Sequence, residues 1–215
     1  FNAHWGYKTD GYFQNAADVA SYPSIAPGTK PGDVKFVDLN KDGKITADDW
    51  AMIGNPFPKY TFGLSSDFSY KNFSLNFLLQ GAAQVDTRLS GGITEIGIAE
   101  AFTHKMVANN YWTPERPNAK FPLPRKSDFR NVGTSDRLII DGSYLRLKNV
   151  QLMYSIPASI CKKIGISAAR VYVSGTNLFT ISKLNEWGLD PEADSGRATY
   201  YPQTSLYTYG LNINF

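Results

Sequence analysis

The residues best suited to chemistry form a run of oxygen donors between Asp38 and Asp49. Their sequence, DLNKDGKITADD, matches the D-x-[DN]-x-[DN]-G pattern of a calcium loop and has an acid at the twelfth position. A hard cation needs several oxygen ligands, which a chain winding around the ion presents at alternate residues. We therefore expect a metal site formed by side chains or carbonyls of these residues: Asp38, Asn40, Asp42, Lys44 and Asp49.

Two details of this run indicate a weak, structural calcium site. Gly43 permits the sharp turn, and Lys44 would bind through its backbone carbonyl. Asp49 replaces the usual bidentate glutamate with a shorter carboxylate, which favours weaker capture. Extracellular calcium would still fill a site with a Kd of ~10⁻⁴ to 10⁻³ M. The expected cofactor is a calcium ion that stabilises the structure of a long loop. The alternative is an Asp/Asn/Gly turn that binds no metal.

The other titratable side chains give catalysis little support. Glycoside hydrolysis needs two carboxyl groups opposed across a cleft, whereas four acids here follow one another along a single stretch. His4 and His104 lie far apart, and neither belongs to a metal or nucleophile motif. The lone cysteine, Cys161, has no partner for an internal disulfide. The sequence therefore predicts no catalytic residues and no enzyme; the acids are Glu186, Asp190, Glu192 and Asp194.

Aromatic residues in long connecting segments are better candidates for ligand contact. Flat rings stack on the faces of sugars, and packing within a loop or against a partner protein would use the same side chains. The expected substrate-binding residues are Trp112, Trp187, Tyr200 and Tyr201.

Composition favours strands joined by turns. Of 215 residues, 42% are hydrophobic and only 19% charged, and 14% are aromatic. The net charge of +3 and the lack of a basic run with interleaved aromatics exclude a nucleic-acid partner from the expectations. No apolar run approaches the ~20 residues that a membrane-spanning helix needs. The strands of a membrane barrel alternate apolar and polar residues, so a search for long apolar runs does not detect them.

Five segments alternate apolar and polar residues with period two, which is typical of strands with two different faces. Tyr70-Lys71-Asn72-Phe73 reads as a tight turn that joins the first two strands into a hairpin. The phase slips by one residue near Lys148 and Asn149, which predicts a β-bulge. Arg146 and Lys148 are expected near the membrane surface, in reach of lipid phosphates. The strands are expected at about 60–70, 73–80, 143–156, 169–180 and 207–215.

Long and short connections alternate along the chain, as in outer-membrane barrels with long extracellular loops and short periplasmic turns. The expected fold is therefore all-β: the C-terminal strands of a large transmembrane antiparallel β-barrel. Residues 1–58 would form an extracellular loop region with the calcium-type loop at 38–49, and residues 59–215 the barrel strands and their loops. Phe215 would end the last strand of the barrel. A soluble β-sandwich is the alternative, because its strands alternate in the same way.

Five segments, together with the terminal strand, resemble the C-terminal region of the SusC/RagA family of TonB-dependent outer-membrane transporters. They occur in the order of the family and span nearly the whole chain. DGSYLRLKNV, followed by VYVSGTNLFT and a terminal aromatic, is the most specific combination. The segments are GYKTDGYFQ, PGDVKFVDLNKDGKI, IGNPFPKYTFGL, SDRLIIDGSYLRLKNVQLMYSIP, ARVYVSGTNLFT and YTYGLNINF.

The resemblance implies a large barrel in the bacterial outer membrane that imports oligosaccharides or peptides. It also implies a SusD-like surface lipoprotein as lid, outer-membrane lipid around the barrel, and TonB as the energy-coupling partner. The plug and the TonB-contacting segment are not among these residues, so TonB contact is expected through an N-terminal part that this sequence lacks. The alternative function is a secreted, calcium-stabilised carbohydrate-binding module of β-sandwich type.

Overall fold

The computed structural model describes residues 3–23, 27–91, 94, 105–125, 130–193 and 203–215. The chain folds as two compact units. Unit 1 comprises Phe1–Phe57, Asp86–Asp141 and Glu192–Tyr200, and unit 2 comprises Pro58–Val85, Gly142–Pro191 and Tyr201–Phe215. The chain thus first leaves unit 1 beside the expected boundary after residue 58, and residues 86–141 return to unit 1.

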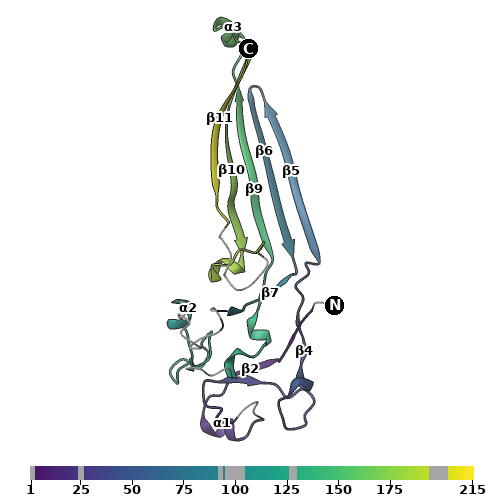
Figure 1. Ribbon diagram of the computed structural model, residues 1–215, viewed down its shortest axis with the longest axis vertical. Helices are drawn as coiled ribbons and strands as arrows, with labels where there is room; N and C mark the ends of the chain where they lie inside the picture. Colours follow the sequence, from purple (N-terminus) through teal and green to yellow (C-terminus); the bar gives the residue numbers. More distant parts are fainter. Residues whose placement is uncertain (1–2, 24–26, 92–93, 95–104, 126–129, 194–202) are drawn as a thin grey trace. The chain divides into compact units, whose positions relative to one another are not determined.

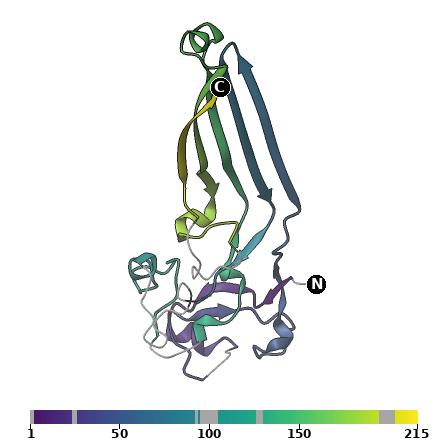
Figure 2. The same ribbon diagram turned by 45° about the horizontal axis from the view of Figure 1, so that its top comes forward.

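Unit 2 is built on one antiparallel sheet whose five strands lie side by side in both ribbon views (Figure 1, Figure 2). All five segments predicted from the sequence are strands of this sheet. Long β6 pairs directly with β9, although all of segment 86–141 separates them in the chain. The sheet order is β11-β10-β9-β6-β5, with bounds β5 Tyr60–Tyr70, β6 Phe73–Ala83, β9 Tyr144–Ser155, β10 Ala168–Ser182 and β11 Leu206–Asn214.

The register places nearly all large apolar side chains of these strands on one face. Tyr70 pairs with Phe73, which pairs with Tyr154, and the same row continues through Val171 to Leu211. We call this surface the apolar face; its exposed members are Tyr60, Phe62, Leu64, Phe68, Tyr70, Phe73, Leu152, Val171, Val173, Phe179, Ile181, Tyr207, Tyr209, Leu211 and Ile213. The opposite, polar face carries mostly Ser, Thr, Asn, Gln and Arg.

The predicted bulge is confirmed at Lys148. Leu78 pairs with Asn149 while its neighbour Leu79 pairs with Leu147, so the register of β6 passes over Lys148. The register of β10 shifts at the same level, between Thr176 and Phe179. One extra residue on β9 explains the phase slip in the sequence and keeps both halves of the strand with their apolar residues on the same face.

The connection from β10 folds onto the polar face. The five-residue 3₁₀ helix η5, Lys183–Trp187, is capped by the Ser182 hydroxyl, which accepts a hydrogen bond from the Leu184 amide. Leu184 is 1% exposed. Arg146 lies on the polar face, 2% exposed, and donates to Thr180 Oγ1 at 2.7 Å and to Asp190 Oδ2 at 2.7 Å. The expectation that Arg146 meets lipid phosphates is therefore wrong, because the side chain is buried in an ion pair.

A short helix, α3 (Ala158–Lys163), joins β9 to β10 at the other end of the sheet (Figure 1). Cys161 is its buried residue, and its thiol lies 3.6 Å from the Ile156 carbonyl. The sheet remains open in the described residues, since β5 and β11 each pair on one side only and no closed barrel forms. Among the residues described, no helix is both long and apolar enough to cross a membrane.

Unit 1 contains short elements where the sequence suggested irregular loops. Three two-stranded sheets pair β1 with β4, β2 with β3 and β7 with β8. Their strands are three or four residues long, too short for a period-two pattern to stand out. The bounds are β1 His4–Gly6, β2 Thr9–Tyr12, α1 Ala16–Ala20, β3 Val34–Phe36, η1 Ala47–Asp49, β4 Ala51–Gly54, β7 Asp86–Arg88, α2 Lys105–Ala108, η3 Arg130–Val132, η4 Asp136–Leu138 and β8 Ile139–Asp141.

A small core holds the segments of unit 1 together. The buried cluster consists of Tyr12, Val34, Phe36, Ile45 and Trp112, with Tyr7, Ala119 and Leu123 packed against it. Buried Asp33 accepts hydrogen bonds from Arg125 and from Asn131 Nδ2 at 3.1 Å. This carboxylate ties Arg125 and Asn131 to the start of β3, so residues distant in the sequence belong to one folded body.

Candidate functional site

An open polar pocket of about 620 Å³ lies within unit 1. Its walls come from β2, from the segment that enters α1, from β3, from residues 117–120 and from η4. Charged and phenolic side chains dominate these walls, so the pocket suits a polar ligand rather than an apolar one. The chemically distinctive lining residues are Asp10, Tyr12, Asp18, Lys35, Lys120 and Arg137.

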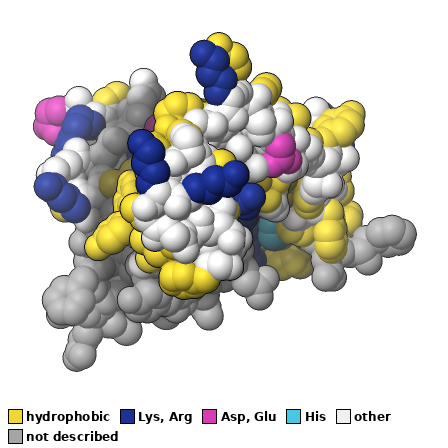
Figure 3. Space-filling view, turned by 90° about the horizontal axis from the view of Figure 1, so that it is seen from above, with side chains coloured by type: hydrophobic (Ala, Val, Ile, Leu, Met, Phe, Trp, Pro, Cys, Tyr) yellow, Lys and Arg dark blue, Asp and Glu magenta, His cyan; other side chains and the backbone are white. Residues whose placement is uncertain are grey.

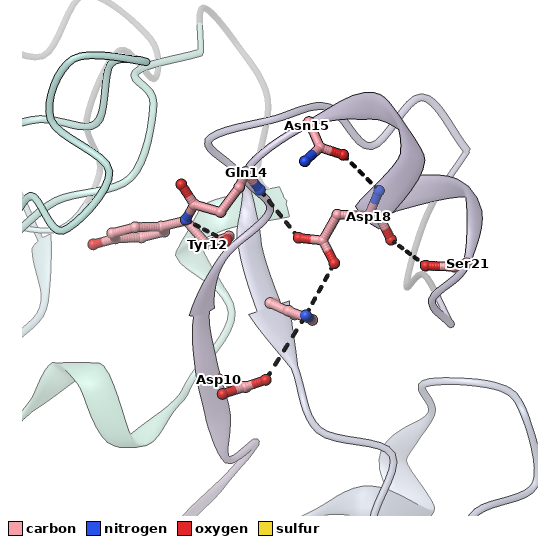
Figure 4. Close-up of polar contacts among 7 residues, drawn as sticks. Asp10, Tyr12, Gln14, Asn15, Asp18 and Ser21 are labelled. Carbon is pink, nitrogen blue, oxygen red and sulfur yellow. Dashed lines mark hydrogen bonds and ion pairs between the residues drawn. The ribbon is translucent and has the colours of Figure 1, made fainter.

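Lys35 on β3 supplies one fixed positive charge. Its ammonium donates to Asp18 Oδ1 at 3.0 Å and lies 3.8 Å from Asp10 Oδ2 (Figure 4). The same nitrogen lies 4.6 Å from the ring centre of Tyr22, a distance suited to a cation–π interaction. The hydrogen bond to Asp18 raises the pKa of Lys35 above its ordinary value. Lys35 therefore stays charged at every physiological pH.

The start of helix α1 positions Asp18. Asn15 caps the helix by accepting a hydrogen bond from the Asp18 amide at 2.9 Å, and the Asp18 carboxylate accepts in turn from the Gln14 amide at 3.1 Å (Figure 4). This reciprocal pattern has the logic of a capping box. The Gln14 amide, followed by the Lys35 ammonium, lowers the pKa of the Asp18 carboxyl. The carboxylate that holds Lys35 is thus itself fixed by local backbone structure.

Arg137 and Tyr12 supply the second fixed group. The guanidinium donates to the Tyr12 hydroxyl at 2.6 Å and to the Lys120 carbonyl at 3.1 Å, and lies 4.9 Å from the centre of the Tyr12 ring. Burial raises the pKa of the Tyr12 phenol, and the nearby Arg137 charge opposes that rise. The pocket therefore combines cations, carboxylates and a neutral phenol, which is an arrangement for hydrogen bonding and charge recognition.

Sequence reasoning missed this pocket. Its residues come from four segments, around positions 9–18, 35, 117–120 and 137. No spacing motif connects a lysine on one strand with an arginine a hundred positions away. Only the fold, by pairing β2 with β3 and bringing η4 beside β2, makes them neighbours.

The calcium-type run forms a tight turn stabilised by its own side chains. Asp38 accepts hydrogen bonds from the amides of Lys41 (2.7 Å) and Gly43 (2.9 Å), and Asp42 accepts from the Lys44 amide (2.8 Å). The Asn40 side-chain oxygen accepts from the Asp42 amide at 2.9 Å. Among the residues described, no three His, Cys, Asp or Glu side chains converge as a metal-binding group. Calcium binding here stays a prediction.

Asp49 has a backbone-organising role in this turn. Its side chain is fully buried and accepts hydrogen bonds from the amides of Leu39 (2.8 Å), Asn40 (3.3 Å) and Thr46 (2.9 Å). Thr46 and Asp49 form a capping box at the start of η1. These hydrogen bonds, the Thr46 amide first, hold the pKa of the Asp49 carboxyl below its ordinary value. The last residue of the run therefore closes the turn with or without a cation.

The aromatic residues expected at a substrate site lie in packed positions or outside the described residues. Trp112 is 4% exposed in the core of unit 1, and Trp187 is 7% exposed in η5 of unit 2. Packing within a loop, the alternative use of these rings, is thus their role in this structure. Tyr200 and Tyr201 lie outside the described residues. Substrate contact by these four residues stays a prediction.

Comparison with known proteins identifies relatives of the chain. A TonB-dependent receptor of Formosa agariphila is 33% identical over 225 residues, which cover 98% of this chain and 22% of the receptor. The TonB-dependent receptor SusC of Bacteroides thetaiotaomicron is 30% identical over 192 residues, covering 86% of this chain and 18% of SusC. No protein-family model matches the chain.

The fold also matches a solved structure. The RagAB peptide transporter superposes over the whole chain with a TM-score of 0.74 at 24% identity, using 23% of the matched transporter chain. The chain thus spans about a fifth of the length of its relatives. TonB-dependent receptors are outer-membrane proteins and not enzymes, so the predicted location and the predicted lack of catalysis are confirmed. The chain is homologous to the SusC/RagA family of TonB-dependent receptors over most of its length.

Proposed function

We propose that the chain forms part of the wall and the extracellular loops of an outer-membrane barrel that imports oligosaccharides or peptides. The observation that carries this proposal is the division of the five-stranded sheet into an apolar and a polar face. Side chains such as Tyr207 (72% exposed) and Tyr60 (61% exposed) leave a broad apolar surface uncovered. Lipid around a barrel would cover that surface, and the polar face would line the lumen.

The open edges of the sheet support the same proposal. β5 and β11 each leave one row of backbone groups unpaired within unit 2, and unpaired backbone groups are not tolerated in a hydrocarbon layer. The remaining strands of a receptor about five times longer would pair with them and close the barrel. A secreted β-sandwich, the alternative function, would instead bury the apolar face against a second sheet, and the described part of unit 2 contains only one sheet.

The substrate, on this proposal, meets loop regions of unit 1. The polar pocket holds both charge signs, Lys35 and Arg137 against Asp10, which suits the charged ends of a peptide as well as sugar hydroxyls. The matched RagAB structure is described as a peptide transporter, which supports including peptides. A SusD-like lipoprotein would act as lid, and TonB would act on a part of the receptor outside this chain.

The turn at 38–49 would, on this proposal, bind calcium as a structural staple. Asp38, Asn40 and Asp42 offer oxygen donors of the kind a hard cation prefers. The Asp38 carboxylate accepts two amide hydrogen bonds and the Asp42 carboxylate one, and each keeps further lone pairs. Calorimetric titration of the full-length receptor with calcium tests this. We expect weak binding, and no binding at millimolar calcium would remove the site.

Uptake by cells tests the transport proposal. Cells with and without the full-length receptor gene would be given labelled oligosaccharide and labelled peptide mixtures separately, each with the TonB system intact or disabled. We expect receptor-dependent accumulation of one substrate class that disappears without TonB. The proposal would be contradicted if cells that lack the gene accumulated both substrate classes as fast as cells that carry it.

A further inference from the structure

The end of the sheet that carries α3 presents basic and apolar side chains together. Lys162 and Lys163 are exposed in the last turn of α3, next to Ile160 (50% exposed) and Ile164 (65% exposed). Figure 3 looks onto this end of the sheet and shows dark-blue basic side chains among yellow hydrophobic ones. Cations in the last turn of a helix also suit its dipole, but that role leaves the two exposed isoleucines unexplained.

The hairpin turn between β5 and β6 lies at the same end. The Ser155 amide, just before α3, donates to the Asn72 carbonyl at 2.8 Å, which brings the two connections together. Lys71 is exposed in that turn, and its ammonium lies 5.3 Å from the ring centre of Tyr70. We call the five exposed residues the basic foot: Lys71, Ile160, Lys162, Lys163 and Ile164.

No acidic side chain offsets these charges nearby in the sequence. Neither 155–170 nor 70–85 contains an Asp or Glu. Asp67 on β5 is the first acid before the hairpin turn, and its carboxylate accepts a hydrogen bond from Asn76 Nδ2. The two connections that carry the three lysines therefore contain no acid themselves. A partner that carries negative charge complements such a surface, and a neutral one does not.

Aromatic residues mark the level at which the foot meets a bilayer. Tyr70, Phe73 and Tyr154 form one row across three neighbouring strands of the apolar face, and the rings of Phe73 and Tyr154 lie 4.8 Å apart. Tyr and Trp gather at the headgroup level of membranes, because one end of the ring is apolar and the other polar. The foot follows directly beyond this row, where lysines reach the headgroups while their carbon chains remain in apolar surroundings.

The position of α3 agrees with this placement. α3 contacts β10, where Ala169 is 4% exposed, although Val171 and Val173, the next residues on the apolar face, are 41% and 55% exposed. The helix thus lies at the end of β10 where the apolar face becomes buried. Its two isoleucines, Ile160 and Ile164, are left uncovered at this end of the sheet.

We propose that the basic foot binds the phosphate groups of anionic phospholipids in the membrane leaflet at the short-turn end of the barrel. Ile160 and Ile164 insert among the upper acyl chains, and the three lysines contact the headgroups. Each lysine near an anionic bilayer contributes roughly a fivefold preference for charged over neutral lipid. This inference rests on the proposed function, because it requires the apolar face to contact a bilayer.

Quenching by brominated lipids tests the proposal. The full-length receptor, carrying Cys161→Ala and a fluorophore on Ser159→Cys, is reconstituted in phosphatidylethanolamine bilayers with a minority of phosphatidylglycerol. In one sample the phosphatidylglycerol carries bromine, and in the other an equal amount of the phosphatidylethanolamine carries it. We expect brominated phosphatidylglycerol to quench several-fold more strongly, and we expect salt to reduce this preference.

Two charge-matched variants separate the foot from general electrostatics. Lys162→Gln/Lys163→Gln should remove most of the several-fold preference for phosphatidylglycerol, since two of the three lysine–headgroup contacts are lost. Lys8→Gln/Lys30→Gln removes the same charge from exposed positions in unit 1 and should leave the preference unchanged. Equal quenching by both lipids, or equal effects of the two variants, overturns the proposal.

A second fluorophore position distinguishes this failure from failure of the barrel proposal. A label on Val173→Cys, on the apolar face, should be quenched by both lipids without headgroup preference. Quenching at position 173 but not at 159 overturns the foot alone, whereas no quenching at either position overturns both proposals. Labelling of Ser159→Cys by an impermeant maleimide in intact cells places α3 outside the cell and also overturns the foot.

Discussion

The ion pair between Arg146 and Asp190 gives the sharpest prediction for unit 2. Arg146 Nη2 and Asp190 Oδ2 lie 2.7 Å apart, with side chains 3% and 12% exposed. The pair joins β9 on the polar face to the segment after η5, so it should hold that segment down on the sheet. Replacing Asp190→Ala removes the partner carboxylate and leaves the arginine charge in a buried position.

The expected cost follows from burial. Removing one partner of a buried ion pair costs ~3–5 kcal/mol, because the remaining charge stays desolvated. Arg146 keeps its hydrogen bond to Thr180, so we expect the lower end, about 3 kcal/mol. Since about 1.4 kcal/mol corresponds to a factor of ten, the segment should open roughly a hundredfold more often.

Hydrogen exchange measured by mass spectrometry reads this opening directly. In the full-length receptor, peptides that cover 183–191 should exchange about a hundredfold faster in the Asp190→Ala variant. Glu186→Ala, which removes an exposed acid from η5 just before Asp190, is the matched control and should cost less than about 1 kcal/mol. Arg146→Met/Asp190→Leu removes both charges and should restore much of the protection.

Two results would refute this reasoning. Unchanged exchange in Asp190→Ala would mean that the ion pair does not hold the segment. An equal rise in Asp190→Ala and Glu186→Ala would mean that any lost acid in this loop has the same effect, so that burial of the pair is irrelevant.

Three further predictions concern the turn in unit 1 and two glycines. Backbone amides, the Thr46 amide first, lower the pKa of Asp49, so the turn at 38–49 should be fully stable above about pH 4 and lose protection from hydrogen exchange as the pH falls through the lowered pKa. Asp49→Asn should abolish this acid transition, and a transition that persists in the variant would contradict the assignment to Asp49. Gly32→Ala should destabilise unit 1 by about 3 kcal/mol in denaturant titrations, because Gly32 has φ +87° and an added Cβ would press on the Trp112 ring. Gly11→Ala, at φ +71° but in open space, should cost only ~1 kcal/mol, and equal costs would contradict the packing argument. Gly210→Val should lower the thermal unfolding midpoint, at a cost of roughly 2 kcal/mol, because the Tyr172 ring lies over Gly210 on the polar face. Thr208→Val on the same face should have little effect, and a larger effect of Thr208→Val than of Gly210→Val would show that Tyr172 adapts freely.

The strands of unit 2 could be predicted because their surroundings impose one rule over many residues. An apolar and a polar environment on opposite sides require strict alternation, and β9 and β10, 12 and 15 residues long, keep it on both sides of the bulge. Even the bulge at Lys148 left a readable trace, since an extra residue shifts the phase of everything after it. The pairing of β6 with β9 across segment 86–141 corresponds to no pattern in the sequence, and only the structure reveals it.

The elements and the pocket of unit 1 could not be predicted on the same basis. A strand of three residues cannot display a period, and the pocket gathers Lys35 and Arg137 from segments without a common motif. An aromatic residue in a loop has the same appearance in the sequence whether it packs or contacts substrate. Trp112 and Trp187 were candidates for substrate contact, and both are buried.

Cysteine accessibility on β10 tests the central claim most directly. Val173 and Ser174 are neighbours whose side chains lie on opposite faces of the sheet. In the full-length receptor in a bilayer, with Cys161→Ala as background, a water-soluble maleimide should label Ser174→Cys and leave Val173→Cys unlabelled. Labelling of both positions, or of Val173→Cys alone, would contradict a sheet whose apolar face contacts lipid and whose polar face lines an aqueous lumen.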